Sequence, residues 1–185
     1  MKTGTLLRIA VVALTMTFAA SLASAQLNSA AQPITLNATL AEQLTVALSA
    51  STVNFNLVAG SAANAGSTNV TATTTWVLQP GRTAVKVFAY FANSAAALSD
   101  GAGDNIPSAD FTIADNAGAP TAVSNSVVFG GANAGLQLAN VAITGANKNA
   151  NRTDTMAFNI NLSTLPQLPA ATYTGTLNIQ AQATP

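Results

Sequence analysis

The sequence predicts an all-β protein, an antiparallel β-sandwich of about eight to ten short strands. Apolar and polar residues alternate along most of the chain after residue 33, as over residues 156–162, and a period of two is typical of strands with one buried face. Turn residues such as Pro80-Gly81 and Gly130-Gly131 separate these runs. No stretch after residue 25 has the three-and-four apolar spacing of an amphipathic helix.

The first 25 residues are predicted to be a secretory signal rather than part of the fold. Lys2 and Arg8 flank an apolar run over residues 9–20, and Ala23-Ser24-Ala25 is typical of a cleavage site. The run is too short, and too interrupted by threonines, for a membrane span. We therefore expect residues 1–25 to be removed before Gln26, and the protein to be exported to the periplasm, the cell surface or the medium.

The remaining residues, 26–185, are enough for one domain with a real core. Residues 26–33 read as a flexible polar leader, and residues 34–185 as a single sandwich domain. Without Lys2 and Arg8, the six basic residues fall to four against six acidic ones, which gives a net charge of −2. Four cations are too few for a phosphate-binding patch, so nucleic acid is not expected as a partner.

Residues 34–48 are the longest alternating stretch near the predicted mature start. At about 3.4 Å per residue a straight strand of this length would reach roughly 50 Å, whereas a compact domain of this size is about 40 Å across. Glu42 interrupts the apolar face, so two strands, 34–40 and 44–48, are expected. Either Glu42 is a solvated bend within one domain, or residues 34–40 are a donor strand that completes a neighbouring sheet. The donor face then consists of Ile34, Leu36, Ala38 and Leu40. Burial of the three larger side chains would contribute on the order of 5–9 kcal/mol, before the conformational entropy lost on ordering the segment is subtracted.

The next three strands are predicted over residues 53–57, 70–76 and 85–91. In the first of them the apolar residues occupy odd-numbered positions, whereas in residues 34–48 they occupy even-numbered ones. A turn or bulge is therefore expected before residue 53. The other two flank Pro80-Gly81 and are expected to form a hairpin.

The second half of the chain continues the same pattern. Alternating residues predict strands over residues 111–113, 123–129, 136–143, 156–162 and 173–181. The apolar phase changes between Leu138 and Val141, which predicts a bulge near Ala139 and Asn140. A corner with two prolines at residues 165–169 leads into the last strand.

The residue inventory argues against enzymatic chemistry. The chain has no His and no Cys, which removes the commonest general base, the thiol nucleophile and the usual zinc ligands. No catalytic residue, cofactor or metal site is therefore predicted. Asp100 and Asp104 lie in a glycine-rich loop and are candidate Ca²⁺ ligands, but their spacing departs from the EF-hand pattern, and Asp-Gly is ordinary turn chemistry.

Three aromatic residues, Trp76, Phe88 and Tyr90, belong to the predicted hairpin and suggest a second class of function. An exposed cluster of this kind would stack against sugar rings, as in carbohydrate-binding modules. The alternative is packing in or near the core, the commoner place for aromatic side chains in a sandwich.

The two ends of the predicted body resemble those of bacterial fimbrial subunits and related secreted sandwich domains. Residues 168–179, LPAATYTGTLNI, are similar to the last strand of that family, in which a proline-containing corner leads into an alternating strand. The alternating segment after the signal resembles its N-terminal extension. The chain departs from the family in having no disulfide, in Ala171 where Gly is usual, and in lacking a clear aromatic near its end.

The resemblance implies an immunoglobulin-like fold, assembly by donor-strand exchange, and a structural or adhesive role at the cell surface. Together with the exposed alternation expected at Ile34–Leu40, it predicts a fibre or pilus-like subunit that associates with itself or with other surface subunits. An extracellular carbohydrate-binding module, with a glycan as partner, is the alternative.

Overall fold

The computed structural model describes residues 27–185, so the predicted signal over residues 1–25 lies outside the described residues. Leu40–Pro185 form one compact unit, and the residues before Leu40 belong to a separate unit. The described residues contain eleven strands and one short 3-10 helix, η1 (Ser108–Asp110). The all-β prediction is therefore confirmed. No helix in residues 27–185 has the length and apolarity needed to cross a membrane.

The larger sheet is antiparallel and has the order β1-β3-β10-β7-β8, with β2 also paired to β10. Its long central strand, β10, carries the alternation that the sequence predicted over residues 156–162. The bounds are β1 (Gln43–Leu48), β2 (Asn64–Ala65), β3 (Val70–Val77), β7 (Phe111–Asp115), β8 (Thr121–Ala122) and β10 (Asn149–Ile160).

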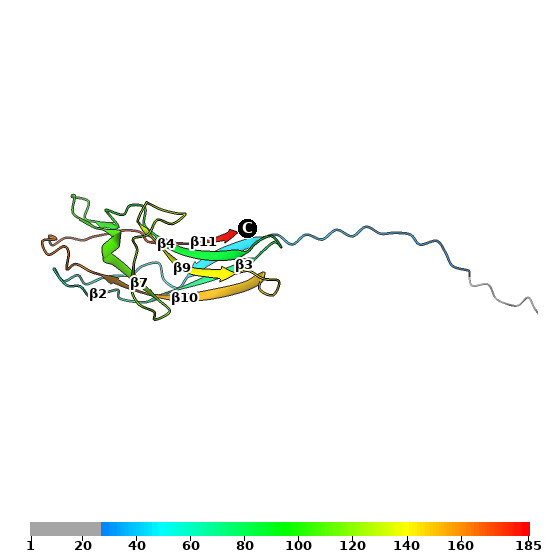
Figure 1. The fold of residues 1–185 in the computed structure, drawn as a ribbon, viewed down its shortest axis with the longest axis horizontal. Coiled ribbons are helices and arrows are strands. Elements are labelled where there is room, and N and C mark those ends of the chain that lie inside the picture. Colours follow the sequence, from blue (N-terminus) through cyan, green and yellow to red (C-terminus); the bar gives the residue numbers. More distant parts are fainter. Residues whose placement is uncertain (1–26) are drawn as a thin grey trace, which may run out of the picture. The chain divides into compact units, whose positions relative to one another are not determined.

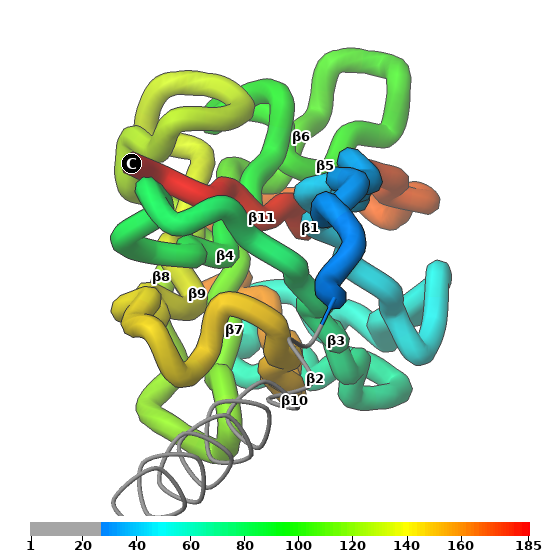
Figure 2. Tube along the Cα trace, turned by 90° about the vertical axis from the view of Figure 1, so that its right-hand side faces the viewer, coloured from blue at the N-terminus to red at the C-terminus, as the bar shows by residue number. Residues whose placement is uncertain are grey.

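The smaller sheet is also antiparallel and has the order β11-β4-β9. Figure 1 labels β4 and β11 in one layer and β3 and β10 in the other, and in Figure 2 the red β11 runs beside the green β4. A two-stranded ribbon, β5-β6, extends the structure at one end. The bounds are β4 (Ala84–Tyr90), β5 (Leu98–Ser99), β6 (Asn105–Ile106), β9 (Gly135–Ala142) and β11 (Asn178–Thr184).

The two sheets enclose one main core, which makes the body a β-sandwich. Val70 and Met156 from the larger sheet share this core with Ala89 and Leu136 from the smaller one. A second, smaller cluster of Trp76, Leu78 and Val85 fills the end near the start of β1 and the end of β11, where Leu44 and Ala183 pack against it.

Two local predictions need correction, and a third is confirmed. β3 and β4 do not form a hairpin, because they lie in different sheets: the turn at Pro80-Gly81 carries the chain from one layer to the other, so that both strands bury their alternating faces in the shared core. The bulge predicted near Ala139 and Asn140 is present, at the adjacent Leu138, because Val87 pairs with Ala139 and Phe88 with Gln137. Residues 34–40 form no strand in this structure.

A charged cluster lies on the face of the larger sheet that also carries the core. Asp154 is completely buried and accepts hydrogen bonds from Arg152 Nε at 2.7 and 2.9 Å and from Asn116 Nδ2 at 3.0 Å. Asn116 Nδ2 also donates to Asp115 Oδ2 at 3.1 Å, whereas Asp115 Oδ1 is buried without a partner among the described residues. Asn116 can bridge both carboxylates because it has a left-handed backbone, with φ of 49°, in the turn after β7.

Burial raises the pKa of the Asp115 carboxyl above its ordinary value, and the Asp154 carboxylate beside it raises this pKa further. A raised pKa means that the folded protein favours the protonated acid. The stabilising contribution is complete below the ordinary Asp pKa of about 3.9 and is lost as the pH rises through the raised value.

Asp115→Asn should therefore raise the thermal midpoint by a few degrees at pH 7, because it removes a carboxylate whose charge is poorly solvated. The gain should disappear near pH 3, where Asp115 is already neutral. Thermal unfolding of both proteins across this range measures the effect, with Asp104→Asn in an exposed loop as the control. A lower midpoint for Asp115→Asn at every pH would contradict this account of the cluster.

Candidate functional site

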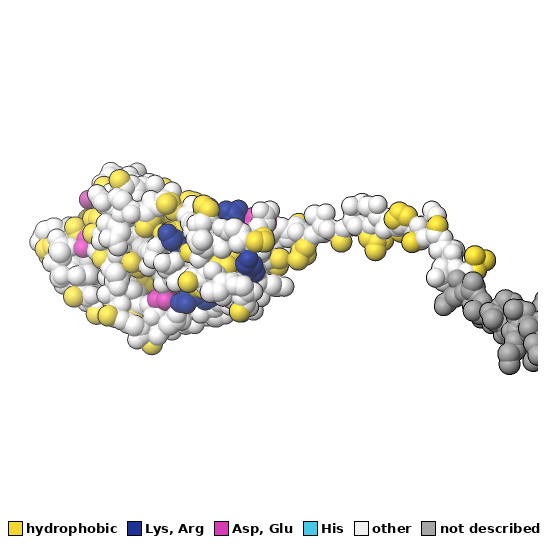
Figure 3. Space-filling view, turned by 45° about the vertical axis from the view of Figure 1, so that its right-hand side comes forward, with side chains coloured by type: hydrophobic (Ala, Val, Ile, Leu, Met, Phe, Trp, Pro, Cys, Tyr) yellow, Lys and Arg dark blue, Asp and Glu magenta, His cyan; other side chains and the backbone are white. Residues whose placement is uncertain are grey.

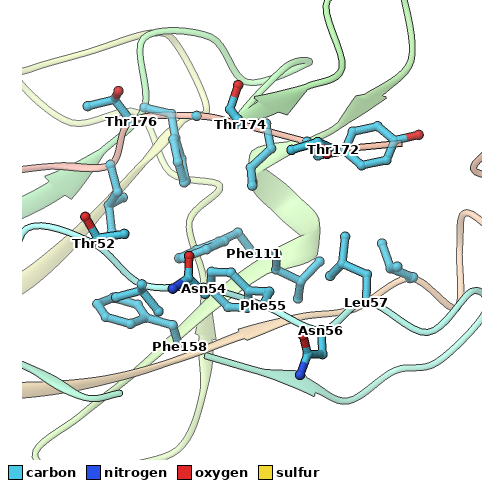
Figure 4. A pocket seen from close by; sticks show the side chains of 18 of the residues that line it. Thr52, Asn54, Phe55, Asn56, Leu57, Phe111, Phe158, Thr172, Thr174 and Thr176 are labelled. Atoms are coloured by element: carbon cyan, nitrogen blue, oxygen red, sulfur yellow. The ribbon is translucent and has the colours of Figure 1, made fainter. Parts of the chain in front are cut away.

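The main cavity of the body is an open groove of about 920 Å³ along one side of the sandwich. One wall is the segment that follows β1, residues 50–57, and the other is the segment that precedes β11, residues 168–177. Figure 4 shows Thr52, Asn54 and Asn56 on one side and Thr172, Thr174 and Thr176 on the other, with Phe111 between the two sides and Phe55 and Phe158 beside Asn54. Core side chains thus form the floor of the groove.

The first wall is extended and is paired on only one side. Asn54 O accepts a hydrogen bond from Ser67 N at 2.8 Å, and Asn54 N donates to Ser67 Oγ at 3.1 Å. The peptide groups of Val53, Phe55 and Leu57 make no hydrogen bond to any residue that the structure describes. Their side chains are half-buried against the core, while the even-numbered residues are exposed.

The second wall is likewise paired on only one side. Thr174 and Ser99 exchange two backbone hydrogen bonds of 2.9 Å, which tie this wall to the β5-β6 ribbon. The peptide groups on either side, at Tyr173 and Gly175, have no hydrogen-bond partner within residues 27–185. The groove therefore runs between two sheet edges that each have free donors and acceptors, and such edges are templates for a further strand.

Two glycines allow the walls to lie where they do. A Cβ on Gly66 would come within 2.7 Å of Val53 Cγ1, so only glycine permits this close approach to the first wall. A Cβ on Gly175 would collide with the carbonyl oxygen of Ala97 under the second wall. Both wall positions thus depend on the absence of a side chain.

The floor of the groove is aromatic. Phe111 lies at its centre, with ring centroids 5.9 Å from Phe55, 5.2 Å from Phe91 and 5.8 Å from Phe158. None of the described lining residues is charged. The one lining phenol, Tyr173, has a raised pKa, first because of desolvation and then because of Asp104 and Asp100, and its hydroxyl donates to Pro169 O at 2.8 Å. This composition suits the binding of apolar side chains.

The predicted donor residues are exposed. Ile34, Leu36 and Leu40 have 83%, 87% and 82% of their surface in contact with solvent, and Ala38 is exposed as well. Figure 3 shows hydrophobic side chains exposed along this segment. Scattered exposed leucines are normal, but here the aliphatic residues form one alternating stripe.

The structure does not gather Trp76, Phe88 and Tyr90 into an exposed platform. Trp76 is 2% exposed and donates from Nε1 to Asn147 O at 2.8 Å. Phe88 is buried edge-on to Phe129, and Tyr90 donates its hydroxyl to Gln180 Oε1 at 2.7 Å. Because β3 and β4 lie in different sheets, the three rings are not neighbours on one hairpin, and they present no common face to a sugar.

The Asp100 loop is held together by its own hydrogen bonds. Asp100 Oδ1 accepts from the backbone N–H groups of Ala102, Gly103 and Asp104 at 2.8, 3.1 and 3.0 Å, as in an Asx turn. Within the described residues no three His, Cys, Asp or Glu side chains come together as metal ligands. The geometry thus supports the turn interpretation of this loop.

No protein-family model, curated protein or solved structure matches this chain.

Sequence reasoning predicted neither wall of the groove as an open edge. Residues 168–179 were singled out only for their resemblance to the fimbrial last strand, and residues 168–177 of that segment form the second wall. Residues 53–57 were predicted as an ordinary strand, whereas they are an edge segment with a single bridge, between Phe55 and Gly66. Their alternation beside a loop of small residues, 59–68, was the available signal, but it does not reveal which side of the strand lacks a neighbour.

Gly175→Ala should lower the free energy of unfolding by about 1–3 kcal/mol, because the new methyl group must displace the second wall from Ala97. Chemical denaturation measures this loss. Gly81→Ala is the matched control, since a Cβ there meets no atom within 4 Å. Equal stability of the two variants would show that the second wall does not depend on this close approach.

Proposed function

We propose that this protein is an exported, non-enzymatic structural subunit that assembles by β-strand addition at the cell surface. In this proposal, residues 34–40 of one copy occupy the groove of the next. The observation that carries it is the presence, on one chain, of an exposed alternating aliphatic segment and of an apolar groove whose two walls have unpaired peptide groups.

The side-chain pattern of the segment fits the groove. In an extended conformation, Ile34, Leu36, Ala38 and Leu40 all point to one face, which meets the phenylalanine floor. The residues between them are Thr35, Asn37 and Thr39. They point to the opposite face, as do the threonines and asparagines along the two walls.

The length and backbone of the segment fit as well. Seven extended residues span about 23 Å, and the eight residues of the first wall span about 26 Å. A strand between the walls can pair its N–H and C=O groups with those left free at Phe55 and Gly175. Main-chain pairing provides affinity and register in strand addition, and alternate side chains in pockets provide specificity.

The donor segment and the groove are different surfaces, so their contact is heterologous and need not close into a ring. Repetition then gives an open chain of subunits, as in a fibre or pilus. The predicted secretory signal and the resemblance of residues 168–179 to fimbrial subunits support the same assignment.

Leu36→Asp should abolish chain formation, because it replaces a buried leucine with a carboxylate and removes about 3 kcal/mol of association energy, or at least a hundredfold in affinity. The measurement is size-exclusion chromatography with light scattering, and electron microscopy, of the protein beginning at Gln26. Asn37→Asp is the matched control, since it adds the same charge to the neighbouring residue on the opposite face.

Two results would contradict the proposal. One is unchanged assembly after deletion of residues 26–40, because the donor is then absent. The other is equal loss of assembly in Leu36→Asp and Asn37→Asp, because added charge alone would then explain the effect.

A further inference from the structure

The outer face of the smaller sheet carries side chains that strand addition does not use. In β4, Val85, Val87 and Ala89 are completely buried between the sheets. Successive side chains of a strand point to opposite faces, so the residues between them point outward. This outward row consists of Lys86, Phe88 and Tyr90.

Amide side chains flank this row on both neighbouring strands. Each residue that pairs with Lys86 or Phe88 across the sheet is Asn or Gln. The pairs are Lys86 with Gln182 and Asn140, and Phe88 with Gln180 and Gln137. Of these four amides only Gln180 has a side-chain hydrogen bond to a described residue, and its Oε1 accepts from the Tyr90 hydroxyl at 2.7 Å. Because an amide has both donors and acceptors, the face offers free groups of both kinds.

Phe129 adds a second half-buried ring beside Tyr90. Its centroid lies 5.8 Å from that of Tyr90, with 32° between the ring planes, and 5.7 Å from that of Phe88, which it meets edge-on. Phe88 is buried, whereas Phe129 and Tyr90 keep part of their surface in solvent. Val128, next to Phe129, is 61% exposed. The two rings and this valine form an apolar patch within a polar face.

The loop that carries Phe129 is held against β4 by the protein itself. Ser126 Oγ donates to Asn133 Oδ1 at 3.0 Å and accepts from Asn133 N at 3.1 Å, which joins the two sides of the loop. Gly130 has a left-handed backbone, with φ of 76°, and a Cβ there would collide with the Tyr90 ring. The patch is therefore formed before any ligand arrives, which lowers the entropic cost of binding.

The charge of this face has one sign. Lys86 is the one charged residue of β4, β9 and β11, and neither ion pair among the described residues includes it. It lies four residues from Tyr90, or about 14 Å along the strand. A ligand that contacts both ends of the row is therefore longer than one sugar ring, and charge complementarity favours one that carries a carboxylate.

We propose that this face binds an oligosaccharide that carries carboxylate groups, such as a polymer of uronic acids. The C–H groups of one sugar ring pack on Phe129 and Tyr90, and hydroxyl groups bond to the flanking amides. A carboxylate of a further sugar unit pairs with Lys86. Phe129 thus takes the place that the sequence gave to Trp76. The proposal does not depend on strand addition, because none of these residues lines the groove.

Isothermal titration calorimetry of the protein beginning at Gln26 tests the proposal, with an oligomer of galacturonic acid as the probe. The double variant Gln137→Glu/Gln180→Glu places two carboxylates at exposed positions of the face and should weaken binding tenfold or more by repulsion. Asn149→Asp/Asn151→Asp adds the same charge at exposed positions on the larger sheet and should leave the affinity unchanged.

Two single variants separate the rings from the charge. Phe129→Ala should weaken binding of the probe about tenfold. Lys86→Gln should weaken it about fivefold, and should leave the weaker binding of an uncharged glucose oligomer of the same length unchanged. Thermal unfolding checks that each variant is folded. Leu36→Asp, which tests strand addition, should not alter the affinity for the probe.

Three results would overturn the proposal. The first is no binding of the galacturonic acid oligomer at millimolar concentration. The second is equal weakening by the two double variants, because net charge alone would then explain the effect. The third is binding of the glucose oligomer as tight as that of the galacturonic acid oligomer, because Lys86 would then recognise no carboxylate. None of these results bears on chain formation through residues 34–40.

Discussion

The groove exists because the two outermost segments of the sandwich do not meet along their whole length. At one end, Leu44 of β1 and Ala183 of β11 pack on the same small cluster of Trp76, Leu78 and Val85. Beyond that end, residues 50–57 and 168–177 remain tied only to their own neighbours, at Ser67 and Ser99. The phenylalanines of the main core then line the groove between the two walls. An unpaired edge beside apolar surface is the condition that favours a further strand.

The composition of the chain is consistent with this arrangement. Charged residues are only 6% of the sequence. The two ion pairs among the described residues are that of Arg82 with Glu42 and that of the half-buried Arg152 with the buried Asp154. Edge strands are commonly protected by inward-pointing or flanking charges. The walls of the groove have none, which is expected of an edge that is meant to pair.

The fold class was predictable from the sequence, because apolar and polar residues alternate in nearly every strand. No stretch of the chain after residue 25 has apolar residues spaced three and four apart, as an amphipathic helix would. β3, β4 and β9 lie close to their predicted ranges for this reason, whereas β10 begins at Asn149, well before the predicted start at Met156. The sheet to which each strand belongs was not predictable. Pro80-Gly81 looks like a hairpin turn but joins β3 and β4 across the two layers, since both strands bury their inner faces in one core.

The candidate site was predictable only on the donor side. The stripe from Ile34 to Leu40 is visible in the sequence, whereas the groove depends on which peptide groups at Val53, Phe55 and Gly175 lack partners in three dimensions. The prediction of an exposed three-ring cluster was wrong at Trp76 for a related reason. The sequence shows that Trp76 has a large aromatic side chain, but it does not show whether that side chain is exposed. In the structure Trp76 is buried in one cluster with Leu78 and Val85.

Backbone amide hydrogen exchange tests most directly whether a strand from another copy completes the groove. The amides to follow are those of the two walls that lack partners in the subunit, at Val53, Phe55, Leu57, Tyr173 and Gly175. In assembled protein, some of these amides and alternate amides of residues 34–40 should exchange slowly, and deletion of residues 26–40 should make the wall amides exchange quickly again. Fast exchange at all of these positions in assembled protein would contradict the account, because the copies would then associate without pairing a strand to either wall.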